Sequence, residues 1–311
     1  MEKNELSPYE LPVVKGDGLG EGIISPENMP VLHERLLENI VYFDTFCRSH
    51  GLTYCLMWGS LIGAVRNHGL IPWDDDMDVA MPRKDFEKLF ELWGTEGDKD
   101  NFSLYRTTND FCAKFPIGVL RNNNSTIIYD FCKDQDVKQG VKIDIEPWDE
   151  MPKGRLSQFL QYLHFRLYEV YSTQRLPNTA ANLSKNRKLK IAIVKLLLDL
   201  VPDEGRRCKI ACRELNKAIK YSKNGNGMVR CNASTKPQAK EDMFDVIDCD
   251  VAGHHLMIPK NYDKILRIYR SYGDYMEKPP VDKRCPNISY SFFDLNSRCE
   301  KYKGIYYCKH E

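Results

Sequence analysis

The spacing of apolar residues changes several times along the chain, and each change predicts a different element. Between Pro30 and Gly51, apolar residues recur every three or four positions, which predicts an amphipathic helix closed by a left-handed glycine. The continuously apolar stretch 52–58 predicts a strand, and 61–66 predicts a short helix after it. Apolar positions within 86–93 predict a further amphipathic helix.

Short β-like runs follow this helical region. They lie at 102–106, 115–121, 125–131 and 140–146, and in the last of them apolar residues alternate with charged ones. Helices and strands in this order predict an α+β fold, with helices packed on a mixed sheet.

Helical periodicity returns at 155–222, where we expect a separate helical layer. Its first helix carries an apolar stripe that we predict to be buried, and a second helix is predicted near 186–201. A last helix is predicted from Tyr262 to Tyr272, before Gly273. The apolar stripe of the first helix in 155–222 consists of Leu156, Phe159, Leu163, Leu167 and Val170. These patterns divide the chain into an arm at 1–27, a core at 28–152, a helical subdomain at 153–235, and a C-terminal segment at 236–311 that packs back on the core.

The composition is that of an ordinary globular protein. Of the 311 residues, 42% are hydrophobic and 29% are charged, and 45 basic against 44 acidic side chains leave a net charge of +1. Nothing in this balance favours a nucleic acid as partner, so any nucleotide is expected to be a small one. The first residues lack the pattern of a signal peptide, and we expect a cytoplasmic protein.

Cysteine usage and one basic stretch bear on location. Eleven cysteines without a CxxC pair favour reduced thiols, and we expect Cys208 and Cys212 to be packed thiols rather than metal ligands. Lys185 to Lys190 is basic and precedes an apolar run from Ile191. Packing within the helical layer is the interpretation we favour for this run, and peripheral contact with the inner membrane face is the alternative.

A row of aspartates lies between apolar residues at 71–80. If this segment is extended, successive side chains point to opposite faces. Asp74, Asp76 and Asp78 then share one face. Carboxylates brought together in this way suit Mg²⁺ or Mn²⁺, and zinc fits less well because no His or Cys lies at ligand spacing. A calcium loop and a solvated acidic loop are the less favoured alternatives. A calcium loop needs glycine where Val79 stands and glutamate where Asp85 stands.

The aspartates have candidate neighbours on both sides. Upstream, Gly59 and Ser60 are expected to form a turn whose backbone N–H groups face a phosphate. Downstream, Asp144 lies on the charged face of the strand at 140–146. It is the candidate third carboxylate, which would bind the metal, accept the proton of the acceptor hydroxyl, or do both. The alternative is an ion pair with Lys142. Glu146 and Asp149 are spare candidates, and the candidate phosphate-binding cations are Arg66, Lys114 and Arg121.

Three segments together resemble the LicD family of the nucleotidyltransferase-fold superfamily. The first comprises the Gly-Ser turn, GAVR at 63–66 and IPWDDDMD at 71–78. The others are VKIDIEPWDEMP at 141–152 and IPKNYDKILRIYRSYGDYMEKPP at 258–280. The resemblance implies a nucleotidyltransferase-like fold with 28–152 as its catalytic core. In the superfamily pattern, fewer residues separate the Gly-Ser turn from the metal-binding aspartates than separate it from Asp76 here. The pair that holds the metal among Asp74, Asp76 and Asp78 therefore stays open. We favour Asp76 and Asp78.

The resemblance also implies a reaction. LicD-like enzymes transfer a phosphorylated small group, with phosphocholine as the favoured case, from a CDP-linked donor to a hydroxyl of a cell-surface glycan or glycolipid precursor, and release CMP. Fukutin-related proteins share the pattern and are thought to use CDP-ribitol, so the donor's headgroup does not follow from the family. The alternative is a nucleotidyltransferase that acts on a small molecule and releases pyrophosphate.

Overall fold

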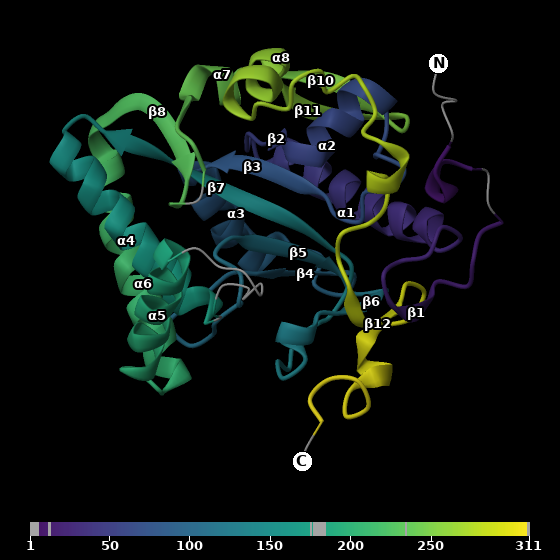
Figure 1. Ribbon diagram of the computed structural model, residues 1–311, viewed down its shortest axis with the longest axis horizontal. Helices are drawn as coiled ribbons and strands as arrows, with labels where there is room; N and C mark the ends of the chain where they lie inside the picture. The colour runs from purple at the N-terminus through teal and green to yellow at the C-terminus, as the bar shows by residue number, and fades with distance from the viewer. Residues whose placement is uncertain (1–5, 12–13, 175, 177–184, 234, 310–311) are drawn as a thin grey trace. The chain divides into compact units, whose positions relative to one another are not determined.

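The computed structural model describes residues 6–11, 14–174, 176, 185–233 and 235–309 (Figure 1). The chain divides into two compact units. The first unit comprises Met1–Leu104, Val119–Glu146 and Glu241–Glu311, and the second comprises Tyr105–Gly118 and Pro147–Lys240.

Two long helices of the first unit were predicted from their apolar spacing, and both are present. Helix α1 covers Met29–Ser49, and Gly51 after it has a positive φ of 62°, as expected for a left-handed closing glycine. Helix α3 covers Arg83–Glu96 and buries Phe86, Leu89 and Trp93.

The main sheet has the strand order β2-β3-β7-β5-β4, with β8 and β9 continuing from β7. Strand β2 is antiparallel to β3, and Cys55 faces Ala80 in their register. Strand β7 passes from the first unit into the second at Pro147. Together with the helices, this sheet confirms the α+β prediction. The strands of this sheet in the first unit are β2 (Cys55–Leu56), β3 (Asp78–Pro82), β4 (Phe102–Tyr105), β5 (Gly118–Asn122) and the first half of β7 (Lys142–Pro152).

A second sheet of the first unit has the order β1-β12-β6, and all its pairs are antiparallel. It joins β1 (Leu19–Gly22), β12 (Tyr290–Asp294) and β6 (Thr126–Ile128), three segments far apart in the sequence. The run at 125–131 therefore belongs to this sheet and not to the main one.

The remaining elements of the first unit are short. Strands β10 (Val246–Val251) and β11 (His254–Pro259) form a hairpin that apolar periodicity did not reveal. The last predicted helix is α8 (Tyr262–Lys264) continued by a π-helix at Ile265–Tyr269. Helix α2 (Trp58–Ile62) likewise continues as a π-helix at Gly63–Asn67, and α7 covers Lys240–Phe244.

The second unit is mainly helical. Its helices are α4 (Arg155–Thr173), α5 (Lys185–Asp199) and α6 (Glu204–Tyr221). Strands β8 (Gly225–Cys231) and β9 (Gln238–Ala239) pair with each other, and β8 pairs with the second half of β7.

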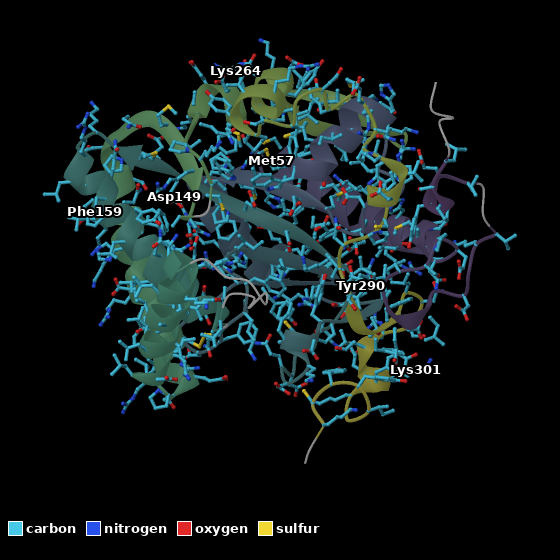
Figure 2. The ribbon with its side chains drawn as sticks, viewed as in Figure 1. Met57, Asp149, Phe159, Lys264, Tyr290 and Lys301 are labelled. Carbon is cyan, nitrogen blue, oxygen red and sulfur yellow. A yellow bond between two sulfur atoms is a disulfide. The ribbon has the colours of Figure 1, made fainter. Side chains whose placement is uncertain are left out.

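The prediction of the buried face of α4 was wrong for its first three members, whereas Leu167 and Val170 are partly buried and pack against the core cluster of the second unit. Leu156, Phe159 and Leu163 are exposed, and Figure 2 shows Phe159 at the outer edge of this helix. The aromatic stripe of Phe165, Tyr168 and Tyr171 is buried instead. Both stripes have helical spacing, so periodicity alone does not decide between them.

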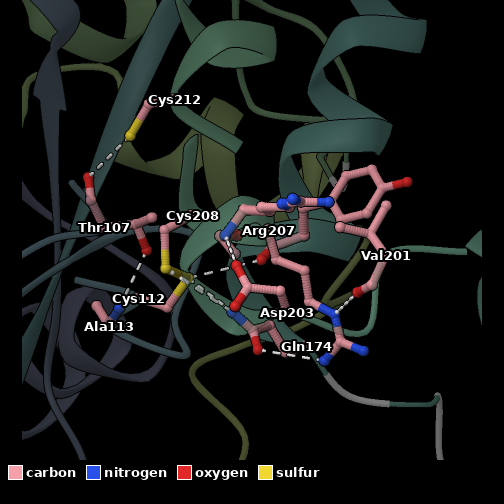
Figure 3. Close-up of a disulfide and its surroundings, with 12 residues drawn as sticks. Thr107, Cys112, Ala113, Gln174, Val201, Asp203, Arg207, Cys208 and Cys212 are labelled. Carbon is pink, nitrogen blue, oxygen red and sulfur yellow. Dashed lines mark hydrogen bonds between the residues drawn. A yellow bond between two sulfur atoms is a disulfide. The ribbon is translucent and has the colours of Figure 1, made fainter. Parts of the chain in front are cut away.

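The expectation of reduced thiols was also wrong for one pair. Cys112 and Cys208 form a disulfide with 5.4 Å between their Cα atoms (Figure 3). Cys212 is a free thiol whose Sγ lies 3.9 Å from the Thr107 carbonyl oxygen. The bonded cysteines are 96 positions apart, and a spacing search detects only cysteines near each other in sequence.

Candidate active site

The acidic row has the alternating geometry that the sequence predicts. Asp74, Asp76 and Asp78 are partly exposed, whereas Asp75, Met77 and Val79 between them are buried. Strand β3 begins at Asp78, and residues 74–77 before it follow a turn at 72–73 and belong to no regular element. The Asp144 amide donates a hydrogen bond to the Met77 carbonyl oxygen at 2.8 Å, so β7 brings its own carboxylates to the row.

Asp74 and Asp76 form the closest part of the cluster. One carboxylate oxygen from each of Asp74, Asp75 and Asp76 lies within 4.8 Å of the other two. Asp75 is held from the C-terminal segment, because its Oδ2 accepts hydrogen bonds from the Ile288 amide at 3.2 Å and the Tyr290 hydroxyl at 3.3 Å. One oxygen of Asp75 is thus engaged by the C-terminal segment.

Burial and mutual repulsion raise the pKa values of the row. Burial, reinforced by the charges of Asp76 and Asp75, raises the pKa of Asp74 to about 8. Burial also raises the pKa of Asp76, and it raises that of Asp78 well above its usual range, with Asp76, Asp144 and Glu146 adding to the effect. Without a cation, the row therefore keeps its protons to a higher pH than ordinary aspartates do.

Asp144 pairs with Lys142 through one carboxylate oxygen and leaves the other without a hydrogen bond among the described residues. Its Oδ2 accepts a hydrogen bond from Lys142 Nζ at 2.6 Å, so the predicted alternative of an ion pair is present. Burial disfavours the Lys142 charge, but Asp144 and Tyr129 outweigh this and raise its pKa. Among the described residues, the buried Oδ1 of Asp144 has no hydrogen-bond partner. That oxygen remains able to take a cation or a proton.

Gly59 and Ser60 lie inside the first turn of α2, not in a turn before it. The Ser60 hydroxyl accepts a hydrogen bond from the Asp78 amide at 2.9 Å, which fixes the start of β3. At Gly59, a Cβ atom would overlap the Asp74 carboxylate. Glycine at this position allows the close approach of an aspartate, and the predicted approach of a phosphate stays a prediction.

The three predicted cations have different surroundings. Arg66 Nη1 donates to the Tyr275 carbonyl oxygen at 3.1 Å, and the guanidinium charge acts on Asp74 to lower its pKa. Arg121 is buried, and its Nη1 donates to Gln139 at 3.5 Å. Lys114 belongs to the second unit, and its role stays a prediction.

Trp58 lies between Glu146 and Arg270, an arrangement that we call the Trp58 clamp and that the sequence pattern did not predict. The indole Nε1 donates to Glu146 Oε1 at 3.0 Å, and the Arg270 guanidinium carbon lies 3.1 Å from the ring centroid. Trp58 has a positive φ of 53°, a conformation that costs a non-glycine residue about 1 kcal/mol or more.

The charges of the same carboxylates act on the pKa of Tyr272. Burial raises its pKa, Arg270 opposes this, and Asp78, Asp74 and Glu146 raise it further. Arg270 and Tyr272 lie within the segment IYRSYGD, for which the sequence predicted a resemblance to the LicD family but no contact with the acidic row. Their relation to the acidic row depends on a chain reversal that no local spacing reveals.

Two comparisons relate this chain to known proteins. The family model for the LicD/FKTN/FKRP nucleotidyltransferase domain matches residues 51–139, which include the Gly-Ser turn and the acidic row. The lipopolysaccharide cholinephosphotransferase LicD of Haemophilus influenzae is 26% identical over 255 residues, which cover 79% of this chain and 90% of that protein. The similarity extends well beyond the matched domain. The chain is thus similar to LicD proteins, within the matched domain and over most of its length.

Proposed function

We propose that this protein is a metal-dependent phosphotransferase. It moves a phosphorylated small group, phosphocholine in the favoured case, from a CDP-linked donor to a hydroxyl of a glycan or glycolipid and releases CMP. The observation that carries the proposal is geometric: carboxylate oxygens of Asp74, Asp75 and Asp76 lie within 4.8 Å of one another, and the Oδ1 of Asp144 has no hydrogen-bond partner among the described residues. The relative that is a cholinephosphotransferase acting on lipopolysaccharide supports the choice of group and acceptor.

The residues present fit a hard divalent cation. Carboxylate oxygens are the preferred ligands of Mg²⁺ and Mn²⁺, and an uncompensated cluster of this kind favours a cation. Asp76 and Asp78 are the favoured ligands, with Asp74 and Asp144 completing the set. Bound there, the cation would neutralise charge on the donor's phosphates.

The protein's own residues supply position and charge. Asp144 is the candidate to take the proton of the acceptor hydroxyl, whose oxygen forms the new bond to phosphorus while the bond to CMP breaks. Arg270, held on Trp58, and Arg66, beside Asp74, are the candidate cations for the donor's phosphates. A rigid clamp holds such a charge in place before the donor arrives, which lowers the cost of reorganisation.

The nucleotidyltransferase alternative uses the same carboxylates. Its support is the matched domain, which is described as a nucleotidyltransferase domain. The two reactions differ in the phosphorus attacked, so their products separate them.

The test is an incubation of the protein with Mg²⁺, a glycan acceptor, and a panel of CDP-linked compounds and nucleoside triphosphates, followed by mass spectrometry. We expect CDP-choline to be consumed, CMP to appear, and the acceptor to gain the mass of phosphocholine. Asp76→Asn should abolish this turnover, and the exposed Asp100→Asn serves as the matched control. Release of pyrophosphate without CMP would favour the alternative, and turnover by Asp76→Asn equal to that of the unchanged protein would contradict the site.

A further inference from the structure

The outer face of α5 carries an exposed apolar stripe. Its members are spaced four, three and four positions apart, so they lie on one side of the helix. Their exposed fractions are 62% for Leu189, 49% for Ile193, 58% for Leu196 and 69% for Leu200, which directly follows the helix.

The opposite face of α5 packs inside the second unit. Val194 and Leu198 are buried in a cluster with Tyr168, Tyr171 and Ala211. The packing that the sequence analysis favoured for this segment is therefore present on one face only. It leaves the stripe of Leu189, Ile193, Leu196 and Leu200 uncovered in the part of the chain that the structure describes.

Lysines border the stripe on both sides. Helical geometry places Lys188 and Lys195, which are two turns apart, along one edge, and Lys190 along the other. From Lys185 to Leu198 the sequence contains no acidic residue. Within the described ranges, none of these three exposed lysines takes part in an ion pair.

We infer that this face of α5 docks on an anionic lipid surface. An amphipathic helix with a polar face rich in lysine lies in the plane of a membrane interface, with its apolar side chains in the headgroup region and its lysine ammonium groups at the level of the phosphates. No described helix is both long enough and apolar enough to cross a bilayer, so the contact is peripheral. A second copy of the chain is the poorer occupant, because a symmetric contact would bring the lysine borders of both copies together.

The first experiment measures sedimentation of the full chain with vesicles. We expect binding to phosphatidylcholine vesicles that contain phosphatidylglycerol, weaker binding at high salt, and little binding to pure phosphatidylcholine. The double variant Ile193→Glu/Leu196→Glu should weaken binding by on the order of tenfold or more. Val14→Glu/Ile305→Glu changes two exposed apolar residues in the first unit by the same charge and should bind as the unchanged protein does.

A second pair of variants tests the charges. Lys188→Gln/Lys190→Gln/Lys195→Gln should lose about fivefold in affinity for each lysine removed. The matched control replaces three exposed lysines elsewhere in the same unit, as Lys153→Gln/Lys223→Gln/Lys236→Gln, and should change binding little.

Three results would overturn the inference. The first is the absence of sedimentation of the unchanged protein with anionic vesicles at low salt. The second is binding by Ile193→Glu/Leu196→Glu that equals binding by the unchanged protein. The third is a dimer, detected by light scattering, that this double variant dissociates, together with an absence of vesicle binding. Circular dichroism of each variant checks that it is folded. The binding needs no donor or acceptor, so its outcome is separate from that of the proposed reaction.

Discussion

The hydroxyl of Ser60 accepts a hydrogen bond from the backbone amide of Asp78, with 2.9 Å between oxygen and nitrogen. The next backbone contact in this region is from the Met57 amide to the Asp78 carbonyl oxygen at 3.0 Å. Both polar groups of the Asp78 backbone are thereby tied to the start of α2. These two hydrogen bonds hold the start of the helix and the end of the acidic row together.

Replacement of Ser60 by alanine should destabilise this contact between the helix and the acidic row. Ser60→Ala leaves the Asp78 amide without its acceptor in a buried place, and an unsatisfied buried donor costs about 1–3 kcal/mol. Chemical denaturation measures this loss. Ser157→Ala, in α4 of the second unit, is the control and should change the free energy of unfolding by less than about 0.5 kcal/mol. Equal effects of the two substitutions would show that the Ser60 hydrogen bond contributes nothing specific.

Replacement of Gly59 by alanine should displace Asp74. The new Cβ atom would overlap the Asp74 carboxylate, so we expect weaker binding of Mn²⁺ and a loss of turnover. Gly94→Ala is the matched control, because Gly94 lies within α3 and has no atom near its Cβ position. That change should stabilise the protein by up to about 1 kcal/mol. Unchanged Mn²⁺ affinity in Gly59→Ala, measured by calorimetry, would contradict the close approach of Asp74.

The stability of the metal-free protein should fall as the pH rises. An unfolded aspartate has a pKa of about 4, and the pKa of Asp74 is raised to about 8 in the folded protein. Between these values the unfolded chain has released a proton that the folded protein still holds, so folding becomes less favourable with increasing pH. Asp76 and Asp78 act in the same direction.

Thermal unfolding with a chelator and with excess Mg²⁺ measures this effect. We expect Mg²⁺ to raise the Tm more at pH 8 than at pH 5, because the aspartates that bind it must lose their protons. Asp76→Asn should reduce the difference. An equal Mg²⁺ effect at both pH values would contradict a carboxylate site.

Loss of the Arg270 charge should lower turnover more than stability. Arg270→Gln removes the guanidinium that lies over Trp58, and we expect kcat to fall by at least tenfold with a small change in Tm. Arg267→Gln is the control, since Arg267 is an exposed arginine paired with Asp263 in the same segment. A kcat of Arg270→Gln within twofold of the unchanged protein would remove Arg270 from the site.

The sequence predicts well what is local and periodic. The sequence predicts an alternation of exposed and buried side chains from Asp74 to Val79, and the structure has it. Helix α1 and the left-handed Gly51 follow in the same way from short-range rules.

Relationships between distant segments could not be predicted. Arg270 reaches Trp58, and Tyr290 reaches Asp75, across 200 or so positions of sequence, and no spacing rule covers such pairs. The exposed stripe of α4 failed as a prediction for a related reason. Two apolar stripes of similar periodicity competed there, and the partner surface decided which of them was buried.

The central claim is that Asp76 and its neighbours bind a divalent cation, and crystals soaked with Mn²⁺ test it most directly. An anomalous difference map should show a peak within about 2.0–2.6 Å of carboxylate oxygens of Asp76 and Asp78. The same soak of Asp76→Asn crystals should lose the peak. A map of the unchanged protein without an anomalous peak beside these aspartates would contradict the account.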